Sequence, residues 1–153
     1  MMFKPGIWSG AVLGAVLSAG VAVAAGPADY EIVDGGIPKA LTDQPGNAEN
    51  GREVAINRKL GNCLACHAVT RLSDQPYHGE IGPPLDGAAT RWSEAELRLI
   101  VANSKKVFEG TMMPGFHTTE GLNRVAEKFE GKTILSAQDV EDVVAFLMTL
   151  NEE

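Results

Sequence analysis

Both cysteines of this 153-residue chain lie in one pentapeptide, Cys63-Leu64-Ala65-Cys66-His67. Two thiols at this spacing can each form a thioether with one vinyl group of a haem, and the adjacent histidine then lies under the iron as a ligand. Two cysteines allow at most one disulfide, so the chain is not a disulfide-stapled scaffold. The motif therefore predicts one covalently bound haem c, attached through Cys63 and Cys66, with His67 as a ligand of the iron.

Other uses of a cysteine pair fit this sequence less well. A zinc site needs a second pair of ligands, and the remaining histidines, His78 and His117, do not stand at the spacing of such pairs. A thioredoxin-like redox motif lies within a βαβ unit, which the sequence does not indicate. A structural disulfide does not need the histidine.

A second iron ligand is expected on a loop far along the chain. Met112 and Met113 stand just before Pro114 in a glycine-flanked loop. We predict Met113 as the axial ligand, because Pro114 fixes its local backbone, and Met112 stays open as the alternative. Met–His ligation leaves no open site for substrate, which suits an electron carrier. His78 and His117 are bis-histidine alternatives, although the simpler interpretation of each is an exposed loop histidine.

Two further residues are predicted to support the haem. The carbonyl of Pro83, in a loop soon after the haem motif, is expected to accept the Nδ1–H of His67. Arg91, followed by Trp92, stands close enough in sequence to supply a donor for the haem propionates. A solvated side chain just before the next helix is an equally good interpretation of Arg91.

The first 48 residues are predicted to lie outside the main domain. Residues 1–25 have Lys4 before an apolar run that ends in small residues, which is typical of a secretory signal peptide cleaved after Ala24 or Ala25. An uncleaved membrane anchor is the alternative, because the uncharged stretch is just long enough to span a bilayer. Residues 26–48 contain three prolines and no helical period, which predicts an extended arm. Its apolar contacts are expected from Ile32, Val33 and Leu41.

Hydrophobic periodicity and capping residues predict a mostly α-helical domain over residues 49–153. One helix is expected from residue 49 or 50 to about 60, a second after a capping box at Ser93, and a third after the cap residue Ser136. A short helix is expected over 122–129, ending at Gly131. Residues 68–90 and 103–121 are predicted to be loops.

The net charge of the chain disfavours one class of binding partner. The formal net charge is −7, from 20 acidic and 13 basic residues, which disfavours binding to nucleic acid. The acidic side chains of the C-terminal third are interpreted as a solvated face that keeps the protein soluble. They are Glu127, Glu130, Asp139, Glu141, Asp142, Glu152 and Glu153.

Together these features resemble a class I cytochrome c. The shared pattern is an opening helix with Gly51, the C-x-x-C-H motif, a G-P-x-L loop, a Met-Pro loop and a closing helix with Phe146; residues 85–91 also match the L-x-G-x-x-x-R stretch of that family. The resemblance implies an all-α class I cytochrome c fold with an extended N-terminal arm. It also implies that Gly51 approaches the helix bearing Phe146.

A narrower resemblance is to SoxX, the family of small monohaem subunits of the SoxAX cytochromes of sulfur-oxidising bacteria. It rests on residues 61–67, 111–116, 121–126 and 134–147. The resemblance implies a periplasmic heterodimer with the larger haem subunit SoxA. That complex couples thiosulfate oxidatively to a cysteine of the carrier protein SoxYZ, an L-cysteine S-thiosulfotransferase reaction. The haem of this chain would then accept the electrons and pass them to a downstream cytochrome c, with no catalytic residue of its own.

Two other functions compete with this prediction. A free-standing periplasmic electron carrier would be a monomer with a charged docking rim. A haem enzyme such as a peroxidase would need an open axial position, contrary to the Met-Pro loop.

Overall fold

The computed structural model describes residue 1 and residues 26–151, so the predicted signal peptide and its cleavage sites lie outside the described residues. The helices are α1 (Ala48–Ile56), α2 (Ala88–Arg91), α3 (Glu94–Asn103) and α4 (Ala137–Leu147), with short 3-10 turns η1 (Cys63–Ala65), η2 (Thr70–Leu72), η3 (Ser104–Lys106) and η4 (Glu127–Phe129). Extended pairing in this part of the chain is limited to one bridge between Val33 and Gly36. The all-α prediction is confirmed.

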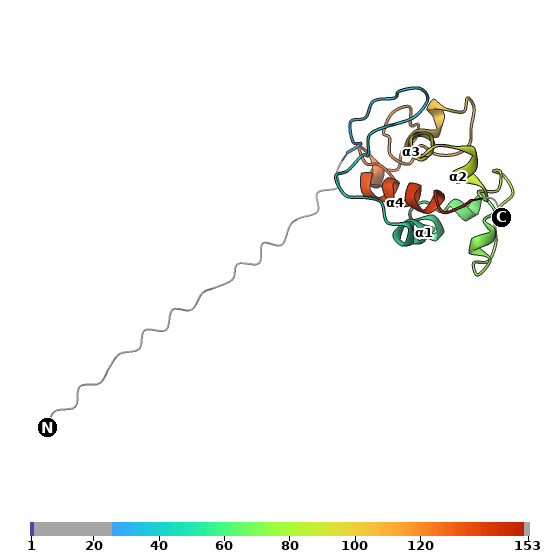
Figure 1. The fold of residues 1–153 in the computed structure, drawn as a ribbon. Coiled ribbons are helices and arrows are strands. Elements are labelled where there is room, and N and C mark those ends of the chain that lie inside the picture. The colour runs from blue at the N-terminus through green and yellow to red at the C-terminus, as the bar shows by residue number, and fades with distance from the viewer. Residues whose placement is uncertain (2–25, 152–153) are drawn as a thin grey trace.

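Helices α1 and α4 cross in direct backbone contact, and α4 lies between α1 and α3 (Figure 1). A Cβ atom added at Gly51 of α1 would lie 1.9 Å from the carbonyl oxygen of Asp142 and 2.9 Å from Cβ of Phe146. Only glycine permits this approach. The crossing that the family resemblance implied is therefore confirmed.

Helix α1 ends earlier than its hydrophobic pattern predicted. Asn57 has an extended backbone, with ψ of 114°, and its N–H closes the helix on the carbonyls of Glu53 and Val54. The N–H of Gly61 donates to the carbonyl of Val54 as well, at 3.2 Å. Residues 57–62 therefore form a turn, and this turn leads the chain directly into the haem motif.

The predicted capping box at Ser93 is present, and the predicted cap residue Ser136 also forms a complete capping box. Ser93 and Glu96 exchange hydrogen bonds at the start of α3, and Ser136 and Asp139 do the same at the start of α4. The helix predicted over 122–129 is wrong, since only the single turn η4 forms there. Gly121 and Arg124 have left-handed backbones, which interrupt a helix, and no side chain of residues 121–132 is buried against the core.

The arm folds back over α3 and α4, and its main apolar contact differs from the prediction. Ile37 is 1% exposed in the core, whereas Ile32 and Val33 are 44% and 48% exposed. The tight turn closed by Val33 and Gly36, with Asp34 in a left-handed conformation, carries the preceding residues to the surface. The expectation for Ile32 and Val33 is wrong, while Leu41 is half-buried against the core.

A buried ion pair fastens this arm. Nε of Arg98 on α3 lies 2.8 Å from Oε1 of Glu141 on α4, and both side chains are nearly inaccessible. Nη1 of Arg98 donates to the carbonyl of Ile37, and Oε1 of Glu141 accepts the N–H of Leu41. Asp142 is also buried, at 5% exposure. The prediction of a fully solvated acidic face is therefore wrong for Glu141 and Asp142. Both carboxylates are buried, and both accept hydrogen bonds from backbone N–H groups of the arm.

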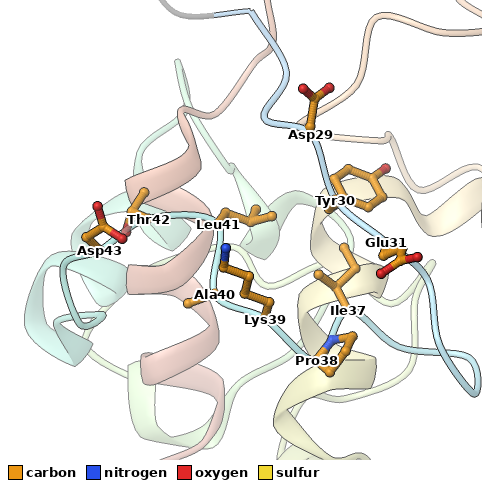
Figure 2. Close-up of a pocket in the computed structure, with 10 residues that line it drawn as sticks. All are labelled: Asp29, Tyr30, Glu31, Ile37, Pro38, Lys39, Ala40, Leu41, Thr42 and Asp43. Atoms are coloured by element: carbon orange, nitrogen blue, oxygen red, sulfur yellow. The ribbon is translucent and has the colours of Figure 1, made fainter.

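The arm encloses a groove of about 540 Å³, lined by residues 29–31 and 37–43 (Figure 2). The figure shows the two stretches of the arm running beside the ribbons of α3 and α4. No residue of the haem motif lines this groove.

Among residues 26–151, none of the helices has the length and hydropathy that crossing a bilayer requires.

Candidate haem site

The haem motif forms one compact turn. The N–H groups of Cys66 and His67 both donate to the carbonyl of Cys63, at 3.1 and 3.0 Å, and buried Leu64 anchors the turn in the core. In a 3-10 turn, residues three positions apart lie on the same side. Cys63 and Cys66 have this spacing, and His67 follows directly, so one tight segment supplies all three residues of the motif.

Both thiols are free and half-buried, without a disulfide between them. Desolvation of the thiolate raises the pKa of Cys63 to about 11. A thiol so poorly ionised does not act as a redox nucleophile near neutral pH, since the thiolate is the reactive form. The environment of Cys63 thus disfavours a thioredoxin-like role.

His67 is oriented by the loop that follows it. Its Nδ1 lies 2.6 Å from the carbonyl oxygen of Pro83. Because a carbonyl can only accept, Nδ1 carries the proton and Nε2 keeps its lone pair for a metal. Among the described residues, Nε2 makes no hydrogen bond. Pro83 therefore occupies the position at which a supporting acceptor was expected.

Gly82 is the residue that sequence reasoning missed at this site. A Cβ atom added there would lie 2.3 Å from Cε1 and 2.6 Å from Nδ1 of the His67 ring, so the backbone of Gly82 lies against the imidazole. The N–H of Gly82 also donates to the carbonyl of Cys66 at 2.8 Å. A glycine immediately before Pro83 was the available sequence signal.

Arg91 binds the same loop. Its Nη1 and Nη2 donate to the carbonyls of Asp86 and Pro84, at 2.6 and 3.0 Å, while the side chain remains exposed. The guanidinium thus ties the end of α2 back to the loop that carries Pro83. The propionate contact stays a prediction, for which the guanidinium has further N–H donors.

The two neighbouring methionines differ in their surroundings. Met113 is half-buried and packs against the hydrophobic core, whereas Met112 is 77% exposed. The carbonyl of Met113 accepts a hydrogen bond from Oγ of Ser104 at 2.8 Å, and its N–H donates to Oγ1 of Thr111 at 3.2 Å. The structure therefore holds the backbone of Met113 and directs its side chain inwards.

His117 was interpreted as an exposed loop residue, and this is wrong, because it is 1% exposed. Its Nε2 accepts the N–H of Ala28 at 2.8 Å, and its Nδ1 donates to the carbonyl of Leu135 at 2.9 Å. The ring thus forms hydrogen bonds with backbone groups of two segments that lack regular secondary structure. Both ring nitrogens are occupied, so His117 has no free lone pair for iron.

His78 is half-buried rather than exposed, and its ring is similarly committed. Nδ1 accepts the N–H of Val69 at 3.2 Å, and Nε2 donates to the carbonyl of Leu72 at 3.1 Å. This arrangement disfavours the bis-histidine alternative.

The residues present fit a haem c. One turn supplies two free thiols and an imidazole whose Nδ1 is satisfied, and a separate loop supplies a half-buried thioether. In residues 26–151 and at residue 1, no cluster of three or more His, Cys, Asp or Glu suggests another metal centre.

Comparison with known proteins identifies the family. The family model described as Cytochrome c matches residues 48–151. The chain belongs to the cytochrome c family. The predictions of the class I cytochrome c fold and of a covalently bound haem c are thereby confirmed, and the protein is a haem c electron-transfer protein.

A solved structure extends the comparison beyond the family domain. The chain is 47% identical to a chain in the crystal structure of SoxXA from P. pantotrophus, with a TM-score of 0.76. The match covers 85% of this chain and 100% of that chain. No curated protein matches. The narrower resemblance to SoxX, made from four sequence segments, is confirmed.

Proposed function

We propose that this protein is the electron-transfer subunit of a SoxAX-type heterodimer in the periplasm. Its haem accepts electrons from the oxidative coupling of thiosulfate to a cysteine of the SoxYZ carrier, and a downstream cytochrome c receives them. The coupling joins the terminal sulfur of thiosulfate to the cysteine sulfur, which releases one proton and two electrons. Since one haem carries one electron at a time, each coupling requires two transfers.

The observation that carries this proposal is the 47% identity over the entire matched chain of SoxXA. The site of this chain is consistent with a role in electron transfer rather than catalysis. Both cysteines belong to the haem motif, and the Met113 loop supports a second axial ligand. The L-cysteine S-thiosulfotransferase activity is accordingly assigned to the complex, with SoxA as the other subunit.

Met113 is proposed as the axial ligand opposite His67. Its half-buried side chain and held backbone support this assignment, in contrast to exposed Met112. In the oxidised protein, Met113→Ala is expected to remove the Met-to-iron charge-transfer band, while Met112→Ala retains it. The reverse result would assign the ligand to Met112.

Arg91 is proposed to contribute a propionate donor while it binds the loop carbonyls. Export is proposed to follow cleavage after Ala24 or Ala25, which N-terminal sequencing of the periplasmic protein tests directly. A mature chain that begins at Ala25 or Gly26 is the expected result. A chain that retains residues 1–24 would support the membrane anchor instead.

The function is tested on the native complex. The haem-stained protein, isolated from its own periplasm, is expected to elute with one larger haem protein in a one-to-one ratio. Thiosulfate added together with SoxYZ should then reduce the haem of this chain, and thiosulfate without SoxYZ should not. A lone species with the mass of the mature chain, whose haem stays oxidised under these conditions, would refute the proposal and favour a mobile carrier.

A further inference from the structure

The Met113 loop lies along the C-terminal end of α3. The N–H groups of Phe116 and His117 donate to the carbonyls of Val101 and Ala102, at 3.3 and 2.9 Å. These bonds hold the loop three and four residues beyond Met113. They do not by themselves place the backbone of the ligand residue.

The contact at Met113 comes from one buried hydroxyl. Ser104, at the junction of α3 and η3, is 0% exposed. Its Oγ lies 2.8 Å from the carbonyl oxygen of Met113 and 3.2 Å from that of Pro114. A hydroxyl has one proton, so the two carbonyls share a single donor.

No second donor reaches these two carbonyls among the described residues. The neighbouring Asn103 does not replace Ser104, because its amide makes no hydrogen bond to either carbonyl; its Oδ1, which can only accept, is buried without a partner. The exposed side chain of Lys105 reaches the loop only at the carbonyl of Thr111. Ser104 is thus the hydrogen-bonded link between α3 and residues 113–114.

We propose that Ser104 is a positioning residue that determines how firmly Met113 is held at the iron. The inference rests on the assignment of Met113 as the axial ligand. Without the hydroxyl, the carbonyl of Met113 finds a replacement donor only by moving towards water, because the methyl group of alanine cannot donate. Such movement favours the conformation in which the thioether has left the iron.

The test measures how easily an added ligand displaces Met113. Ferric holoprotein is titrated with imidazole, and loss of the Met-to-iron charge-transfer band reports the exchange. For Ser104→Ala we expect the apparent Kd for imidazole to fall about fivefold, which corresponds to about 1 kcal/mol, the net value of one hydrogen bond.

Ser93→Ala is the matched control, because it removes a hydroxyl from the other end of the same helix. Ser93 accepts the N–H of Glu96 in the capping box, so its loss costs about 1 kcal/mol of stability without a contact to the Met113 loop. We expect the imidazole Kd of Ser93→Ala to equal that of the wild type. Unfolding by denaturant, measured for both variants, shows whether their global stabilities are comparable.

An unchanged Kd in Ser104→Ala, or an equal change in Ser93→Ala, would overturn the inference. Met113→Ala separates this outcome from failure of the ligand assignment. A band that survives Met113→Ala overturns the assignment and the inference together. A band lost in Met113→Ala, with an unchanged Kd in Ser104→Ala, overturns the role of Ser104 alone.

Discussion

Replacement of Gly82 by alanine should disturb the proximal histidine more than any other single methyl group at this site. The added Cβ would lie 2.3 Å from Cε1 of His67, about 1 Å closer than ordinary van der Waals contact allows. Either the imidazole or the Gly82–Pro83 backbone must therefore move by about that amount. Because Nδ1 of His67 and the Pro83 oxygen are 2.6 Å apart, a displacement of this size breaks their hydrogen bond.

The effect on stability and on the reduction potential can be estimated from that geometry. Overpacking costs about 1–3 kcal/mol and the lost hydrogen bond about 1 kcal/mol, so we expect Gly82→Ala to lower the free energy of unfolding by about 2–4 kcal/mol. As the predicted iron ligand, His67 would be made more basic by its Nδ1–H bond, which would favour ferric iron. If the full value of about 1 kcal/mol favours the ferric state, its loss raises the reduction potential by about 40 mV.

The assay is a redox titration of the purified holoprotein, paired with denaturant unfolding. Gly131→Ala is the control, because Gly131 has a φ of +68° and no atom within 4 Å of an added Cβ. It introduces backbone strain of about 1–2 kcal/mol far from His67, and we expect no change in its potential. A potential that is the same in Gly82→Ala and in the wild type would refute the reasoning, as would an equal rise in Gly131→Ala.

Three other substitutions test the packing of the fold. Gly51→Ala places a Cβ 1.9 Å from the carbonyl oxygen of Asp142, so α1 and α4 must separate, and denaturant unfolding should show a loss of at least about 3 kcal/mol. Arg98→Met leaves the buried carboxylate of Glu141 without its partner and should lower the free energy of unfolding by about 3–5 kcal/mol. His117→Leu removes the acceptor for the arm, and amide hydrogen exchange of residues 27–31 should become faster, with a global cost of about 1–3 kcal/mol.

The expectations for Arg98 and His117 each have a clear contrary result. The partly exposed pair of Arg52 and Asp74 provides a control for Arg98, since Arg52→Met should cost less than about 1 kcal/mol. Equal losses in the two arginine variants would contradict the importance of burial. Unchanged exchange in the arm of His117→Leu would mean that the hydrogen bond from Ala28 does not order this segment.

The site was more predictable from the sequence than the rest of the molecule, because its chemistry depends on local spacing. The C-x-x-C-H spacing is a signature of haem attachment, so five consecutive letters were enough to predict Cys63, Cys66 and His67 as the residues that hold the haem. The capping boxes at Ser93 and Ser136 are local in the same way. The preference for Met113 over Met112 rested in the sequence on Pro114 alone, and the structure adds that Met113 is half-buried while Met112 is exposed.

Pairing between distant segments could not be predicted from spacing alone. Glu141 and Asp142 were interpreted as solvated because nothing near them in sequence indicates a partner. Their partners are Arg98, 43 residues away, and backbone groups of the arm about 95 to 100 residues away. The arm itself has too few apolar residues for a period, so its order depends on contacts supplied by α3 and α4.

The arm and the Met113 loop share one support, which connects a segment outside the family domain to the loop that carries the proposed ligand. The ring of His117 receives the N–H of Ala28 and donates to Leu135, while its own backbone N–H is bound to Ala102 at the end of α3. His117 stands four positions after Met113 in the same loop. The start of the arm is therefore hydrogen-bonded to the loop that holds the proposed ligand. The Cytochrome c family model does not include this part of the arm, because its match begins at residue 48. A cytochrome domain without this arm would expose Nε2 of the corresponding histidine to solvent, and the loop would lose one of its fixed points.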